Sequence, residues 1–200
     1  MANYTAIADA GRTLIELLRD RMHDLVSASS IMLASPGEID AQDAPRLCLF
    51  LYQVNESPSM KNQEMQPINP GTLQYPPLTL DLYYMLTCYG SAQITDRTER
   101  TLEEHTVMGR AMSVLSDNAV IRGSALKGSL AGTGEDLRIT FNPVPQDEIN
   151  RLWNSFPEKP YKLSACYMVS PVRIDSTRQV EAKRVLEKDT DYYQIKGVSS

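Results

Sequence analysis

The stretch that decides the fold runs from Tyr75 to Gly90 and reads YPPLTLDLYYMLTCYG. Every second residue from Leu78 belongs to one apolar face, made of Leu78, Leu80, Leu82, Tyr84, Leu86 and Cys88. The alternate residues, from Thr79 to Tyr89, are mixed in polarity. Because side chains alternate across a strand, this pattern predicts a long strand with one face on a core and the other in a wetter environment. Pro76-Pro77 cannot donate to a sheet and marks the beginning of the strand.

Around this strand the sequence predicts three helices and three further strands. Apolar residues recur every three or four positions in the helices, at about residues 5–26, 98–115 and 145–156. The strands are short apolar runs at residues 46–54, 137–141 and 161–169, the last ended by Pro171. The order helix, strand, strand, helix, strand, helix, strand predicts a single α+β domain. We expect a mixed or antiparallel sheet of about four to five strands, with helices mainly on one face.

Two segments lack this periodicity. Residues 55–74 are polar and contain prolines, so we interpret them as a long loop that either extends into solvent or binds a partner. Three large apolar side chains in it, Met60, Met65 and Ile68, favour binding. Residues 176–200 are charged and include the cluster Tyr192-Tyr193-Gln194-Ile195. This extension is either a frayed end or an arm that docks on a neighbouring subunit, and residues 1–175 form the domain itself.

Composition excludes several classes of function. The 200 residues carry a formal net charge of −5 and no clustered Lys or Arg, which disfavours nucleic acid as a partner. The N-terminus has no signal-peptide pattern, and no apolar run approaches the length of about 18 residues that a membrane span requires. The three cysteines are widely spaced in apolar segments, which is typical of reduced core thiols. We therefore expect no metal, no cofactor and no membrane insertion.

Catalytic patterns are weak. Ser124-Ala125-Leu126-Lys127 matches S-x-x-K and Ser116-Asp117-Asn118 matches S-D-N, but K-T-G is absent and the order is unlike that of serine β-lactamases. His23 and His105 are the only histidines, and no nucleophile motif surrounds either one. The sequence predicts no enzyme, and a small serine hydrolase that uses Ser124 and Lys127 is the alternative.

Two motifs together resemble one protein family. Residues 76–90 are similar to its strand motif PPL-x-LDL-x-Y-x-LT-x-YG, and residues 104–112 to its helix motif E-x-H-x-x-x-GRAM. The opening helix and the segments 137–141, 148–153 and 161–167 follow in the family's order. The family comprises the tube-terminating cap proteins of phage-tail-like contractile injection systems of the antifeeding-prophage and virulence-cassette type. The resemblance covers roughly residues 1–175 of the 200. Many members carry further C-terminal domains, so this chain is expected to be a minimal version.

The resemblance implies a structural role and a fold like that of phage tail terminators. Such proteins form a homo-oligomeric ring, six-fold in known members, on the end of the inner tube away from the baseplate. There they terminate the polymerisation of tube and sheath. The implied partners are further copies of this chain, the inner tube protein and the sheath protein. Assembly is expected in the bacterial cytoplasm, in a particle that is either released or associated with a membrane.

The sequence also suggests where partners bind. The candidate interface residues come from the loop, the glycine-bearing stretch after residue 120 and the extension: Met60, Asn62, Met65, Ile68, Arg122, Lys127, Tyr192, Tyr193 and Ile195. An assembly chaperone, or another structural component of the same particle, is an alternative to the cap.

Overall fold

The computed structural model describes residues 3–39 and 44–181. Contacts divide the chain into two compact units. The larger unit comprises Met1–Gln63 and Pro77–Asp175, and the smaller comprises Glu64–Pro76 and the chain from Ser176 onward.

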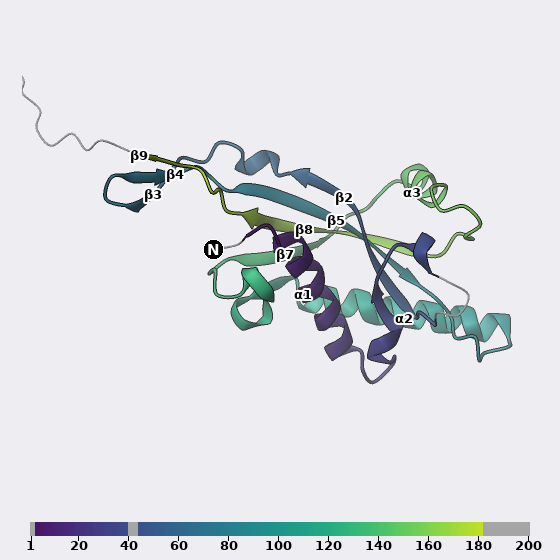
Figure 1. The fold of residues 1–200 in the computed structure, drawn as a ribbon. Helices are drawn as coiled ribbons and strands as arrows, with labels where there is room; N and C mark the ends of the chain where they lie inside the picture. The colour runs from purple at the N-terminus through teal and green to yellow at the C-terminus, as the bar shows by residue number, and fades with distance from the viewer. Residues whose placement is uncertain (1–2, 40–43, 182–200) are drawn as a thin grey trace, which may run out of the picture. The chain divides into compact units, whose positions relative to one another are not determined.

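The larger unit is built on a six-stranded sheet (Figure 1). In spatial order its strands are β1 (Ile31–Leu33), β2 (Leu47–Glu56), β5 (Leu78–Cys88), β8 (Ser164–Ile174), β7 (Asp136–Phe141) and β6 (Val120–Arg122). The pairing of β1 with β2 is parallel and the other four pairings are antiparallel, so the sheet is mixed. This confirms the predicted α+β class. The two edge strands, β1 and β6, were not predicted because three residues are too few to show an alternating pattern.

Helices cover the sheet from both sides. α1 (Ala6–Arg21) and α2 (Arg97–Asp117) pack over the face that holds Leu82, Tyr84 and Leu86 of β5, each at most 1% exposed. Each buried side chain of this size contributes roughly 1.5–3 kcal/mol to folding. The apolar face predicted from Leu78 onward is therefore confirmed, except that Leu78 itself is exposed.

α3 (Gln146–Trp153) covers the opposite face. Met85 of β5 and Cys166 of β8 form a second apolar cluster there with Trp153 and Phe156. The Trp153 indole N–H donates to Ser164 Oγ at 3.0 Å, so the polar atom of this buried ring is satisfied. The prediction of a wetter second face is wrong for most of β5: Met85 and Thr87 are fully buried, because α3 turns its own apolar stripe onto this side.

Pro171 does not end its strand. The pairing of β5 with β8 shifts between Leu80, which lies opposite Val172, and Leu82, which lies opposite Val169. Ser170 and Pro171 fall in this bulge, where a residue without an N–H removes no ladder hydrogen bond. β8 therefore continues to Ile174.

The smaller unit contains a three-stranded antiparallel sheet in the order β3 (Gln66–Asn69), β4 (Thr72–Gln74) and β9 (Gln179–Glu181). Part of the long loop expected at residues 55–74 is therefore a hairpin, and the beginning of that segment is the end of β2. Pro70-Gly71 forms the turn, and Gly71 adopts a φ of +94°, which favours glycine. The dipeptide is a turn signal in the sequence, but the flanking residues are too polar to read as strands.

A buried carboxylate joins α1 to the turn at Gly128–Leu130 (η5). Asp9 is 4% exposed and accepts hydrogen bonds from Thr5 Oγ1 at 2.6 Å and from the N–H and Oγ of Ser129, each at 2.8 Å. A Cβ at Gly128, whose φ is +58°, would lie 2.1 Å from Asp9 Oδ1, so only glycine allows this approach. Burial raises the pKa of Asp9, but the hydrogen bonds and the Arg12 charge outweigh it, so the pKa is lowered.

The lowered pKa predicts a pH-dependent contribution to stability. A carboxyl whose pKa is lower in the folded state stabilises the fold above its unfolded pKa, near 3.9, and the stabilisation is lost as pH falls through the folded value. We expect Asp9→Asn to reduce the unfolding free energy by about 1–3 kcal/mol at pH 7 and by clearly less at pH 3. Urea titrations at the two pH values measure both differences.

The control is Asp20→Asn, which removes an exposed carboxylate from the same helix and should change stability little at either pH. If Asp9→Asn lowers the unfolding free energy equally at both pH values, the lowered pKa of Asp9 is contradicted.

Candidate interface surfaces

The predicted interface residues belong to different elements of the two units. Met60 is half-buried in the turn after β2, the 3-10 helix η3 (Pro58–Met60), and Asn62 is exposed just beyond it. Met65 and Ile68 belong to the smaller unit. Arg122 is exposed on β6 and Lys127 lies beside α1, where its Nζ forms an ion pair with Glu16 at 3.0 Å. Tyr192, Tyr193 and Ile195 lie outside the described residues.

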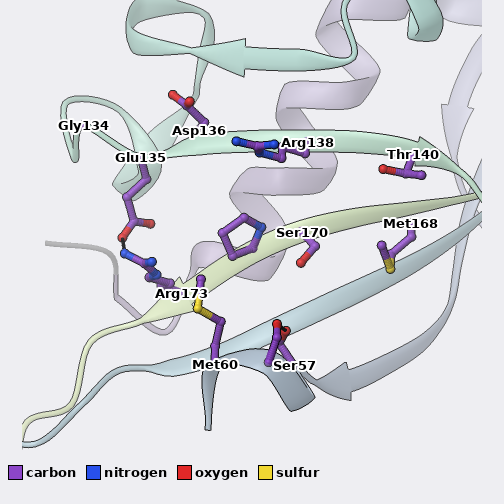
Figure 2. A pocket seen from close by; sticks show the side chains of 12 residues that line it. Ser57, Met60, Gly134, Glu135, Asp136, Arg138, Thr140, Met168, Ser170 and Arg173 are labelled. Carbon is purple, nitrogen blue, oxygen red and sulfur yellow. Dashed lines mark hydrogen bonds and ion pairs between the residues drawn. The ribbon is translucent and has the colours of Figure 1, made fainter. Parts of the chain in front are cut away.

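A groove of about 550 Å³ opens on the part of the sheet that α3 leaves uncovered (Figure 2). Its floor is the outer face of two paired strands: Arg138 and Thr140 of β7 lie opposite Ser170 and Met168 of β8. The η3 turn, with Ser57, Ser59 and Met60, forms one wall. The turn that leads into β7, with Gly134, Glu135 and Asp136, forms the other. Pro171 and Arg173 complete the lining.

Two ion pairs fix the second wall. Arg173 Nη1 donates to Glu135 Oε1 at 2.8 Å, drawn as a dashed line in Figure 2, and both side chains are more than two-thirds buried. Arg122 Nε donates to Asp136 Oδ2 at 2.9 Å. The predicted interface residue Arg122 therefore does not line the groove itself but binds a residue that does. On the neighbouring strand β5, the buried carboxylate of Asp81 accepts a hydrogen bond from Ser170 Oγ.

Arg138 differs from the other charged residues of the groove. It is exposed on β7, and within the described chain no carboxylate lies within ion-pair distance of it. Glu135 and Asp136, the acidic lining residues, are each held by another arginine. The groove therefore presents one available guanidinium between hydroxyl groups and two methionines, Met60 and Met168. Arg138 was not among the predicted interface residues, although its alternation with Leu137 and Ile139 places it on a polar strand face.

A second surface lies on the smaller unit. Met65, just before β3, is 39% exposed and Val180 of β9 is 40% exposed, while Ile68 and Leu73 are half-buried. Leu73 lies directly opposite Val180 in the sheet. In the part of this unit that the structure describes there is no helix to cover these side chains. A sheet this small is marginally stable by itself, so these exposed apolar side chains are suited to contact with a partner.

The residues considered for catalysis do not form a site. Ser124 lies in an exposed 3-10 turn (η4, Gly123–Ala125), and no hydrogen bond between described residues joins it to Lys127. His23 and His105 are both exposed on or near helices. All three cysteines are buried thiols, and burial raises the pKa of Cys88 to about 12, which keeps it protonated.

Within residues 3–39 and 44–181, no group of three or more His, Cys, Asp or Glu side chains is arranged to hold a metal ion. None of the helices in these ranges has the length and hydropathy that a bilayer-spanning helix requires.

A comparison with models of protein families shows which family the chain belongs to. The model described as the Pvc16 N-terminal domain matches residues 9–188, which is most of the chain. The chain belongs to the Pvc16 N-terminal domain family. This confirms the family indicated by the motifs at residues 76–90 and 104–112. No curated protein gives a significant sequence match.

Two solved structures share the fold of this Pvc16 N-terminal domain. The sheath/tube terminator of the extracellular contractile injection system PVC, in its extended state, superposes with a TM-score of 0.66 and 19% identity. The match covers 100% of this chain and 67% of that one. The cap of the anti-feeding prophage, a tube-terminating cap, gives a TM-score of 0.64 and 20% identity. It covers 92% of this chain and 61% of the cap, so this chain spans about two thirds of the length of both.

The two ion pairs of the groove predict different costs of removal. Glu135→Gln leaves the largely buried Arg173 without its carboxylate and should lower the unfolding free energy by about 1–3 kcal/mol. Arg122→Gln breaks a pair whose arginine is 66% exposed and should cost less than about 1 kcal/mol. Urea unfolding of the two variants measures both values, and equal costs contradict the assignment of Arg173 and Glu135 as the pair that holds the wall.

Proposed function

We propose that this protein is a structural cap of a contractile injection system. The observation that carries the proposal is the match of the whole chain, at a TM-score of 0.66, to a protein described as a sheath/tube terminator. The family membership of residues 9–188 and the fold match to a tube-terminating cap support the same role. The role is structural rather than catalytic, and it needs extended contact surfaces rather than an enclosed site.

In this role the chain forms a homohexameric ring on the end of the inner tube away from the baseplate. The ring contacts the tube protein and the last layer of sheath, and it ends the polymerisation of both. A ring closed by heterologous contacts can satisfy the exposed end of a helical polymer without offering a new growing end. The subunits assemble in the bacterial cytoplasm before the particle is released or held at a membrane.

The two surfaces described above are the proposed contacts. Exposed apolar side chains of the smaller unit, among them Met65 and Ile68, pack against a neighbouring protein. Met60, Asn62 and Arg122 lie at or beside the groove and contribute to a second interface. Lys127 on its separate surface, and Tyr192, Tyr193 and Ile195 of the extension, remain proposed interface residues.

Deletion of the gene tests the capping role. We expect tubes without this chain to grow past their normal end and to show a broad length distribution, because nothing pairs their open termini. Negative-stain electron microscopy of purified particles measures the lengths, and expression of the unaltered chain from a plasmid should restore them. Particles of normal length in the deletion strain contradict the proposal.

The exposed apolar residues of the smaller unit predict a defect in incorporation into particles without a loss of folding. Met65→Asp combined with Ile68→Asp places charges where a partner must exclude water, so particles should incorporate the variant at least ten-fold less than the unaltered chain. Immunoblots of purified particles measure incorporation, and circular dichroism checks that the variant is folded.

Leu102→Asp is the matched control, because Leu102 is an apolar residue of α2 that is 52% exposed and lies outside the smaller unit. Normal incorporation of the Met65/Ile68 variant overturns this interface.

A further inference from the structure

A separate pocket of about 230 Å³ lies between α1 and the strands β1 and β2 of the larger unit. Ile7, Ala8 and Gly11 of α1 line one part of it. Leu33 of β1 and Leu49 of β2 line another, so much of the lining is apolar. An apolar protein cavity of about 150 Å³ is large enough to hold benzene, so this pocket has room for one ring with a substituent. The remaining lining residues are Ala34, Ser35, Glu38, Phe50, Leu51 and Tyr84.

Tyr84 brings a polar atom to the inner end of this pocket. The residue is 1% exposed, and its hydroxyl makes no hydrogen bond to any other residue of the described chain. A Cβ at Gly11 would lie 3.5 Å from the hydroxyl oxygen, so the glycine leaves the space beside that oxygen open. Burial raises the pKa of Tyr84, so the hydroxyl stays protonated and can donate. A buried hydroxyl without a partner costs free energy, which a ligand that bonds to it recovers.

Ordered water is a poor partner for this hydroxyl. A buried water typically makes about three hydrogen bonds to polar groups. The polar side chains at the pocket, Ser35 and Glu38, are engaged in a capping box of their own turn. Ser35 Oγ accepts from the Gly37 N–H at 3.2 Å, and Glu38 Oε2 accepts from the Ser35 N–H at 3.0 Å. A water beside Tyr84 would therefore have mainly apolar side chains around it.

We propose that this pocket binds a small neutral molecule, the size of a substituted phenol, whose single polar group hydrogen-bonds to the Tyr84 hydroxyl. The apolar lining selects against a charged ligand, because removing a charge from water without a partner is costly. Glu38, the charged residue in the lining, is exposed and adds repulsion against an anion. The site does not depend on the proposed capping role.

Calorimetric titration of the full-length chain with p-cresol tests the proposal. Toluene is the matched ligand, because it has the same ring and methyl group but no hydroxyl. We expect saturable one-to-one binding of p-cresol. Tyr84→Phe removes only the hydroxyl and should weaken p-cresol binding roughly three- to ten-fold, the contribution of one hydrogen bond. The affinity for toluene should be the same in both proteins.

Gly11→Ala tests the location of the site. Its methyl group would lie 3.0 Å from Leu33 Cδ2 and 3.5 Å from the Tyr84 oxygen, so it narrows the pocket and should weaken both ligands at least five-fold. Gly109→Ala is the matched control, since Gly109 is a glycine of α2 where no described atom beyond its own helix lies within 4 Å of an added Cβ. This control should bind both ligands normally, and circular dichroism checks that every variant is folded.

Absence of p-cresol binding overturns the proposal, and so does an unchanged affinity in either Tyr84→Phe or Gly11→Ala. Photolabelling with 4-azidophenol, read by mass spectrometry, distinguishes a small ligand from a side chain of a neighbouring subunit. Labelling of the pocket in the free chain and in purified particles supports the proposal. Labelling of the free chain alone overturns it, because a neighbour then fills the pocket in the assembly. Tube length in the deletion strain tests the capping role independently of these outcomes.

Discussion

The burial of β5 on both faces is the constraint on which the rest of the larger unit depends. Along its edges this strand pairs with β2 and β8, and above and below it lie two separate apolar clusters. A central strand of this kind satisfies its backbone only through its two neighbours and removes its side chains from water only when both faces are covered. α1 and α2 on one side and α3 on the other are therefore necessary to the fold.

The cover on the second face is incomplete, and this creates the groove. α3 is short, with residues 146–153, and reaches only the part of the sheet around Met85 and Cys166. Beyond it, β7 and β8 present Arg138, Thr140 and Met168 between two turns. The ion pair of Arg173 with Glu135 and the hydrogen bond from Ser170 to Asp81 satisfy most of the charge there. A polar floor with one available guanidinium is suited to protein binding.

The described part of the smaller unit also has apolar side chains that no helix of that unit covers. Its three short strands supply hydrogen bonds, but Met65 just before β3 and Val180 on β9 stay exposed to a degree that an isolated sheet tolerates poorly. In an assembly of identical subunits, such a surface is covered by the neighbour, and the free energy of folding and that of assembly become linked. In the proposed cap, this linkage stabilises the surface fully only when a partner covers it.

The sequence by itself determined the long strand, its apolar face, the three helices, the α+β class and, through two motifs, the family. These features depend on residues close together in the chain, whose spacing of two or of three to four is visible directly. Only the tertiary structure decided the bulge that keeps Pro171 within β8, the hairpin at residues 66–74 and the groove. The groove combines Met60, Arg138 and Met168, which lie far apart in sequence. Their proximity follows from strand order and register, which local periodicity does not encode.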